Sequence, residues 1–84
     1  MTLQQLQYLV ALAESNSINQ AAQNLFVSQS GISKAIKQLE KALNTKLFLR
    51  TQKGVRLTTE GKLLYPYVER GLSLIHISEP TRLR

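Results

Sequence analysis

This 84-residue chain contains no cysteine, no tryptophan and no aspartate, and it has a single histidine. Without cysteine it forms neither disulfides nor thiolate metal sites. Its few glutamates are scattered, and no glycine-rich phosphate loop is present. These residue types do not supply a metal cluster, a carboxylate dyad or a catalytic triad. We therefore expect no enzymatic activity, no metal and no cofactor.

Long apolar runs are also missing. No stretch approaches the roughly 20 apolar residues of a membrane-spanning helix. The N-terminal segment lacks a basic region, and Gln and Glu interrupt its apolar residues, so it does not read as a signal peptide. The sequence therefore predicts a cytoplasmic protein without a membrane partner.

Acidic residues are few relative to basic ones. Lys and Arg number 11 against 5 Asp and Glu, which gives a formal charge of +6. In a chain long enough for one small domain, this balance favours a polyanionic partner, nucleic acid first and an anionic membrane surface second. A solvated basic surface without any partner is the alternative.

The most informative segment is 19–43, which predicts a short helix, a tight turn and a second helix. Ser28 is expected to cap the second helix, over 28–43, and apolar residues then recur on one face of it while polar and cationic residues occupy the other. We expect Phe26 and Val27, in the turn, to pack into the core. In a basic chain this pattern is typical of a helix-turn-helix whose second helix enters DNA.

The flanking segments complete a fold prediction. A capping box at Thr2 and Gln5 begins a first helix, whose stripe of Leu3, Leu6, Leu9 and Val10 is assigned to the core. Two short apolar-rich runs around the loop 51–54 predict a hairpin, and a further helix follows Thr58 or Thr59. The expected fold class is all-α dominated: a winged helix-turn-helix of three helices, a short two-stranded wing and the start of a linker helix.

The stretch 3–61 resembles the N-terminal winged helix-turn-helix of LysR-type transcriptional regulators. The residues that carry the resemblance, in chain order, are Leu6, Tyr8, Ser17, Ala21, Ala22, Leu25, Val27, Ser28, Gln29, Ser30, Ile32, Ser33, Ile36, Leu39, Glu40, Leu43, Leu47, Phe48, Arg50, Leu57, Thr58 and Gly61. The resemblance implies a sequence-specific, double-stranded-DNA-binding transcription factor that acts as a dimer or tetramer.

The resemblance also implies a domain organisation. We expect a DNA-binding domain over 1–58 and the start of a linker and dimerisation helix over 59–71. In the resembled family a small-molecule effector binds a downstream domain of periplasmic-binding-protein type. That domain is missing from this chain, and the linker helix is short.

The last segment, 72–84, is predicted to be a non-native tail. Its letters LSLIHISEPTR, over 72–82, resemble the conceptual translation of a transposon-based sequencing adapter. Such segments are excluded from fold reasoning, so His76 receives no role.

Base-reading side chains are expected near the start of the second helix of the motif, where they reach the floor of the major groove. Gln29, Ser30, Ser33 and Lys34 occupy that place. Gln pairs with adenine, Lys with guanine, and Ser with several bases. An ordinary solvated helix face is the alternative interpretation.

Other polar residues are assigned to the DNA backbone. Ser28, Lys37 and Arg50 are expected to contact phosphates, and Lys53 at the wing tip is expected to enter the minor groove. Lys41 fits a phosphate contact or a solvated surface equally well.

The stripe of Leu63, Leu64, Tyr67 and Val68 in the last helix has two open interpretations: it packs on its own domain, or it faces the linker helix of a second chain. Two alternatives to DNA-dependent regulation also remain. The chain is a winged-helix protein-interaction module, or it is a truncated fragment that folds without regulating anything.

Overall fold

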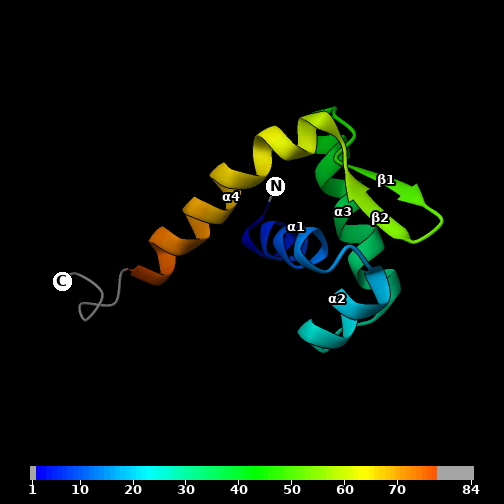
Figure 1. Cartoon of the computed structure of the whole chain (residues 1–84). Coiled ribbons are helices and arrows are strands. Elements are labelled where there is room, and N and C mark those ends of the chain that lie inside the picture. The colour runs from blue at the N-terminus through cyan, green and yellow to red at the C-terminus, as the bar shows by residue number, and fades with distance from the viewer. Residues whose placement is uncertain (1, 78–84) are drawn as a thin grey trace.

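The computed structural model describes residues 2–77, and their side chains as far as Gly71. The described elements are the helices α1 (Leu3–Ser15), α2 (Ile18–Leu25) and α3 (Gln29–Leu43), the strands β1 (Phe48–Thr51) and β2 (Gly54–Leu57), and the helix α4 (Thr59–Ile77). Figure 1 shows α1, α2, α3 and the hairpin as one body from which α4 extends. This mostly helical architecture with a two-stranded wing confirms the predicted fold class. Within residues 2–77, no helix combines the length and apolarity needed to cross a membrane.

The starts of α1 and α3 follow the predicted capping chemistry, and α2 begins in the same way. The Thr2 hydroxyl accepts a bond from the Gln5 N–H, and the Gln5 side chain bonds back to the Thr2 N–H, so the capping box of α1 is complete. Ser17 caps α2 through the Gln20 N–H. Ser28 caps α3, with its hydroxyl 3.0 Å from the Gly31 nitrogen. Short-range side-chain chemistry therefore sets where each of these helices begins.

The ends of α1, α2 and α3 share a left-handed residue, at Asn16, Phe26 and Asn44. Asparagine tolerates this conformation, whereas a bulky side chain is strained in it. At Phe26 the left-handed backbone turns the ring outward, and the residue is 94% exposed. The prediction that Phe26 packs into the core is therefore wrong, because the geometry of the helix end outweighs the apolar character of the side chain. Val27 is half-buried against the core, as expected.

Replacing Phe26 by Asn should stabilise the fold. The change relieves left-handed strain and removes almost no buried apolar surface, so the free energy of unfolding should rise by about 0.5–1 kcal/mol. Urea denaturation measures it, and the reverse change at an equivalent helix end, Asn44→Phe, should lower stability by a similar amount. A clear loss of stability in Phe26→Asn would show that the ring is buried in solution.

The core lies between α1, α2, α3 and the hairpin. Leu9 and Leu12 supply the buried face of α1, while Leu3 is 46% exposed, so its assignment to the core is wrong. Leu3 is the first residue of α1 and stands at the outer end of its apolar stripe. The remaining buried apolar side chains of the cluster are Ala21, Ala22, Ile32, Ile36, Leu39, Leu47, Phe48, Val55 and Val68.

The hairpin is antiparallel, and its register pairs Phe48 with Leu57 and Arg50 with Val55. Because side chains alternate along a strand, these residues share the face that turns toward the helices. The start of β2 is tied to the turn between α1 and α2, where the Val55 N–H donates to the Asn16 carbonyl at 3.1 Å. Gly54 permits this approach with a φ of 141°, since a Cβ there would lie 2.3 Å from the same carbonyl oxygen.

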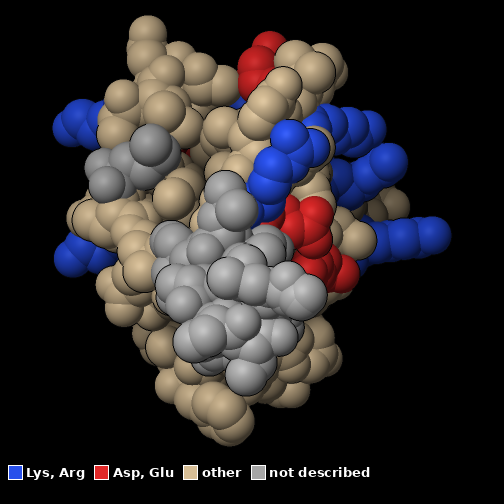
Figure 2. Space-filling model, turned by 90° about the vertical axis from the view of Figure 1, so that its left-hand side faces the viewer, with Lys and Arg blue, Asp and Glu red and all other residues tan. Residues whose placement is uncertain are grey.

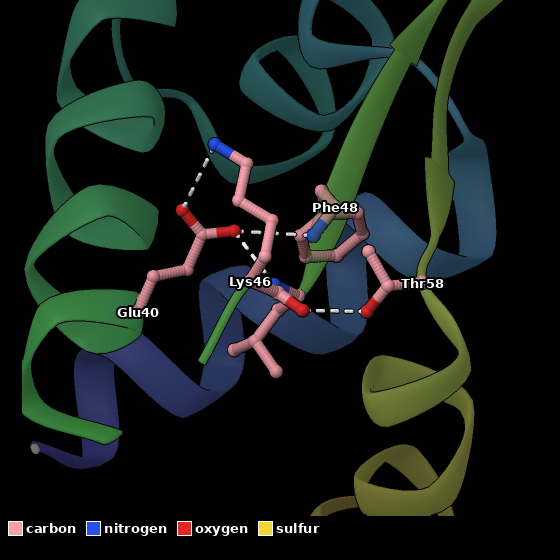
Figure 3. Close-up of polar contacts among 5 residues, drawn as sticks. Glu40, Lys46, Phe48 and Thr58 are labelled. Carbon is pink, nitrogen blue, oxygen red and sulfur yellow. Dashed lines mark hydrogen bonds and ion pairs between the residues drawn. The ribbon is translucent and has the colours of Figure 1, made fainter. Parts of the chain in front are cut away.

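A partly buried carboxylate joins α3 to the hairpin. Glu40 Oε2 accepts the N–H groups of Leu47 and Phe48, at 2.8 and 3.1 Å (Figure 3). Thr58 then ties the start of α4 to the same segment, because its hydroxyl donates to the Lys46 carbonyl at 2.6 Å and accepts the Gly61 N–H. The helix α3, the hairpin and α4 are therefore held through one short stretch of backbone.

The helix α4 runs without a break across the predicted domain boundary at 71 and ends at Ile77. The predicted non-native tail thus begins within this helix, and residues 78–84 lie outside the described residues. The domain boundaries and the foreign origin of the tail stay predictions. Resequencing the source DNA across this junction tests them.

Candidate nucleic-acid interface

The outward side of α3 carries the largest group of predicted DNA contacts. We call this surface the α3 face, and it is lined by Ser30, Ser33, Lys34, Lys37, Gln38 and Lys41. It exists because Ile32, Ala35, Ile36 and Leu39 occupy the opposite side of the helix and are buried. The period of 3.6 residues then leaves the lysines in solvent, one helical turn apart. The buried apolar face predicted for this helix is therefore confirmed.

The hairpin adds a cation beside this face. Arg50 of β1 lines a shallow cleft between α3 and the hairpin together with Ser33 and Lys37. Glu40 also lines the cleft, and its Oε2 accepts hydrogen bonds from the backbone N–H groups of Leu47 and Phe48. The cleft therefore holds three cations, Lys37, Lys46 and Arg50, against the one carboxylate of Glu40, and this excess of positive charge attracts anions.

Lys53 lies apart from the α3 face. It stands at the tip of the hairpin and lines a separate depression with Asn16, Gln52 and Arg56. Sequence reasoning gave Arg56 no role, yet it is exposed beside Lys53. This depression therefore has two cations on its lining, Lys53 at the tip and Arg56 within β2, and positive charge of this kind is attracted to a narrow minor groove.

At the start of α3, Gln29 does not stand alone in solvent. Its Nε2 donates to Asn19 Oδ1 of α2 at 3.4 Å, while Ser28 Oγ lies 3.3 Å from Ser30 Oγ. The predicted base readers thus divide into Gln29, which is tied to α2, and Ser30, Ser33 and Lys34, which belong to α3 alone. Nothing in the sequence signalled Asn19, because the contact joins residues ten positions apart on different helices.

Acidic side chains gather elsewhere, between α1 and α4. Tyr65 donates to Glu69 Oε2 at 3.3 Å. Burial raises the pKa of the Tyr65 phenol above its ordinary value, and the carboxylates of Glu14 and Glu69 raise it further. The phenol therefore stays protonated at neutral pH. Figure 2 shows acidic side chains grouped near the middle of one side of the molecule, with cationic side chains at both edges and more of them on the right.

The stripe on α4 divides between two environments. Val68 is buried in the core and Leu64 packs partly against it. Leu63 and Tyr67 are 68% and 70% exposed. They line an apolar depression that continues to Leu43 at the end of α3. The surface available to another chain is therefore narrower than the predicted set of four residues.

A three-helix body, a cationic recognition helix and a basic hairpin tip define a winged helix-turn-helix of the nucleic-acid-binding class. Residues 3–62 match the family model of the bacterial regulatory helix-turn-helix proteins of the lysR family. The chain belongs to this family, which confirms the resemblance drawn from its motifs.

Individual relatives agree with the family model. The uncharacterized HTH-type transcriptional regulator YkuM of Bacillus subtilis (strain 168) is 45% identical over 67 residues, which make up 80% of this chain and 23% of the relative. HTH-type transcriptional regulator ClcR of Pseudomonas putida is 39% identical over 84 residues, 100% of this chain and 28% of the relative. The chain thus spans about a quarter of the length of these curated relatives.

Among solved structures, the complex of the BenM DBD with catB site 1 DNA is similar with a TM-score of 0.89 and 34% sequence identity. The match covers 99% of this chain and 96% of that chain. The similarity therefore extends over nearly all of a chain that was crystallised on DNA.

Proposed function

We propose that this chain binds double-stranded DNA in a sequence-specific manner and thereby regulates transcription in the cytoplasm. In this proposal α3 lies in the major groove, and the hairpin tip at Lys53 enters the adjacent minor groove. The observation that carries it is the α3 face, where three lysines and the adjacent Arg50 converge around small polar side chains. The similarity to a chain crystallised on DNA supports the same conclusion.

The proposal sorts the candidate residues into two groups. Gln29, Ser30, Ser33 and Lys34 stand at the start of α3 and read base edges. Ser28, Lys37, Arg50 and Lys53 contact the backbone or the minor groove. The first group determines which sequence is bound, and the second determines register and overall affinity.

Alanine variants of Lys34 and Lys37, which lie on the same face of α3, test whether the two groups differ in this way. Lys34→Ala should weaken binding by about 1–3 kcal/mol and relax the preference at one base pair. Lys37→Ala should weaken binding to all sequences about equally and lower the slope of log affinity against log salt by about 0.9. Fluorescence anisotropy on a panel of duplexes at several salt concentrations measures both effects. Uniform losses in both variants would show that Lys34 is not a base reader.

Salt dependence also separates DNA binding from the alternative of a protein-interaction module. Each phosphate neutralised contributes about 0.9 to the slope, so a chain with several phosphate contacts loses affinity steeply as salt rises. An affinity for duplex DNA that hardly changes with salt would favour the protein-interaction module.

We also propose that the chain pairs with a second copy through α4. The exposed residues Leu63 and Tyr67, with the depression reaching Leu43, offer an apolar surface for that contact. In the longer relatives, we expect a small-molecule effector to bind the part that this chain does not span. We propose no catalytic activity for the chain itself.

A further inference from the structure

The first turn of α3 receives a polar contact from α2. Figure 1 shows α2 beside the end of α3 at which that helix begins. Asn19, in the first turn of α2, holds its Oδ1 toward two amide groups: Gln23 Nε2 at 3.2 Å and Gln29 Nε2 at 3.4 Å. Asn19 is thereby the residue of α2 whose side chain bonds to a predicted base reader.

The direction of these bonds determines what Gln29 presents to DNA. A glutamine amide has two N–H donors and one carbonyl acceptor. One N–H of Gln29 is used by Asn19, which leaves the second N–H and Oε1 free. A donor beside an acceptor matches the N7 and N6–H groups of adenine in the major groove.

A free glutamine would not hold this arrangement. The terminal torsion of glutamine is broad and roughly two-fold, so the amide can turn over and exchange its donor and its acceptor. The bond from Gln23 Nε2 to Asn19 Oδ1 at 3.2 Å keeps this oxygen facing Gln29. A turned Gln29 amide would then set its Oε1 against Asn19 Oδ1, two acceptors without a proton between them. Asn19 therefore favours one of the two orientations.

We propose that Asn19 is a positioning residue for base recognition: it holds the carboxamide of Gln29 in the orientation that reads adenine. The inference rests on the proposed function, because it requires Gln29 to contact a base. Supporting a contact residue by a neighbour that fixes its orientation is a general requirement for precise recognition.

The test is selection from a randomised duplex library with the full chain, four single variants and one double variant. Gln29→Ala should abolish the preference for adenine at one position, a loss of about tenfold or more. Asn19→Ala should lower the preference at that same position about three- to tenfold and leave the other positions unchanged. Asn19→Asp should keep the preference, because a carboxylate also accepts from Gln29, although its charge lowers affinity for every sequence.

Asn24→Ala is the matched control. Asn24 lies on α2, is exposed, and accepts from Gln20 Nε2 at 3.0 Å, so it makes a similar amide contact that does not reach α3. It should leave the base preference unchanged. Thermal melting of each variant separates loss of folding from loss of recognition.

Different outcomes overturn the role of Asn19 and the role of Gln29. If Gln29→Ala alters one position but Asn19→Ala only weakens all sequences equally, Asn19 contacts phosphate and the positioning role is overturned. If Asn19→Asp loses the preference as Asn19→Ala does, the assigned bond direction is overturned. If Gln29→Ala changes no position, Gln29 reads no base, and the proposed function itself loses that contact. In the background of Gln29→Ala, Asn19→Ala should add no further change in preference.

Discussion

Glu40→Ala should destabilise the fold by about 2–4 kcal/mol, because it leaves the N–H groups of Leu47 and Phe48 without their acceptor. Both donors bond to the same carboxylate oxygen at the entry to β1 (Figure 3). Bonds to a charged acceptor are stronger than neutral ones, and an unsatisfied backbone donor next to the core has little access to water. Urea denaturation of the purified chain gives the loss directly.

Two control variants separate the possible causes. Lys46 lies 3.9 Å from Glu40 Oε1, but its side chain is 68% exposed, so Lys46→Ala should cost less than about 0.5 kcal/mol. Glu40→Gln retains one carbonyl oxygen for the two N–H groups and should cost about 1 kcal/mol. If Lys46→Ala were as damaging as Glu40→Ala, the ion pair rather than the backbone contacts would hold the hairpin to α3.

Gly54→Ala should destabilise the chain by about 2–4 kcal/mol through the hairpin. A side chain disfavours the φ of 141°, and the new Cβ would lie 2.3 Å from the Asn16 carbonyl oxygen. Relief requires the hairpin to move away from the turn between α1 and α2, which breaks the bond from the Val55 N–H to Asn16. Thermal unfolding measures the loss, and DNA affinity should fall with it because Lys53 moves too.

Gly71→Ala is the control for this prediction. A Cβ at Gly71 meets no atom within 4 Å, and the residue lies inside α4. Alanine favours a helix over glycine by up to about 1 kcal/mol, so this variant should be neutral or slightly stabilised. A Gly54→Ala variant that unfolds at the same temperature as Gly71→Ala would contradict the packing of the hairpin described here.

Local chemistry explains which parts of the fold could be predicted from the sequence. The caps at Thr2 and Ser28 and the left-handed end at Asn44 depend on residues within a few positions of each other. The buried face of α3 follows from its period alone. The match to the lysR family adds that this order of elements is shared by related chains.

The errors and omissions have a common physical origin in tertiary structure. Phe26 looked like a core residue because it is apolar, but its backbone conformation directs it outward. Which residues of the α4 stripe are buried depends on how α4 lies against α1, and periodicity does not give that angle. The contact between Asn19 and Gln29 joins separate helices, so only the structure reveals it.

The sequence therefore predicts which residues of the candidate site are exposed, but it does not predict how their side chains are placed relative to one another. The helical period places Lys34 and Lys37 in solvent from sequence alone, and the structure adds the position of Arg50 beside Lys37. That position depends on the register of the hairpin, where Arg50 pairs with Val55. A strand shifted by one residue would turn Arg50 to the other face.

The central claim is that the α3 face reads a DNA sequence. The most direct test is binding of the chain to a randomised duplex library at two salt concentrations, followed by sequencing of the bound fraction. The account predicts enrichment of a short motif with approximate two-fold symmetry, and lower total binding at the higher salt concentration. Binding that enriches no sequence, or no binding at either salt concentration, would contradict it.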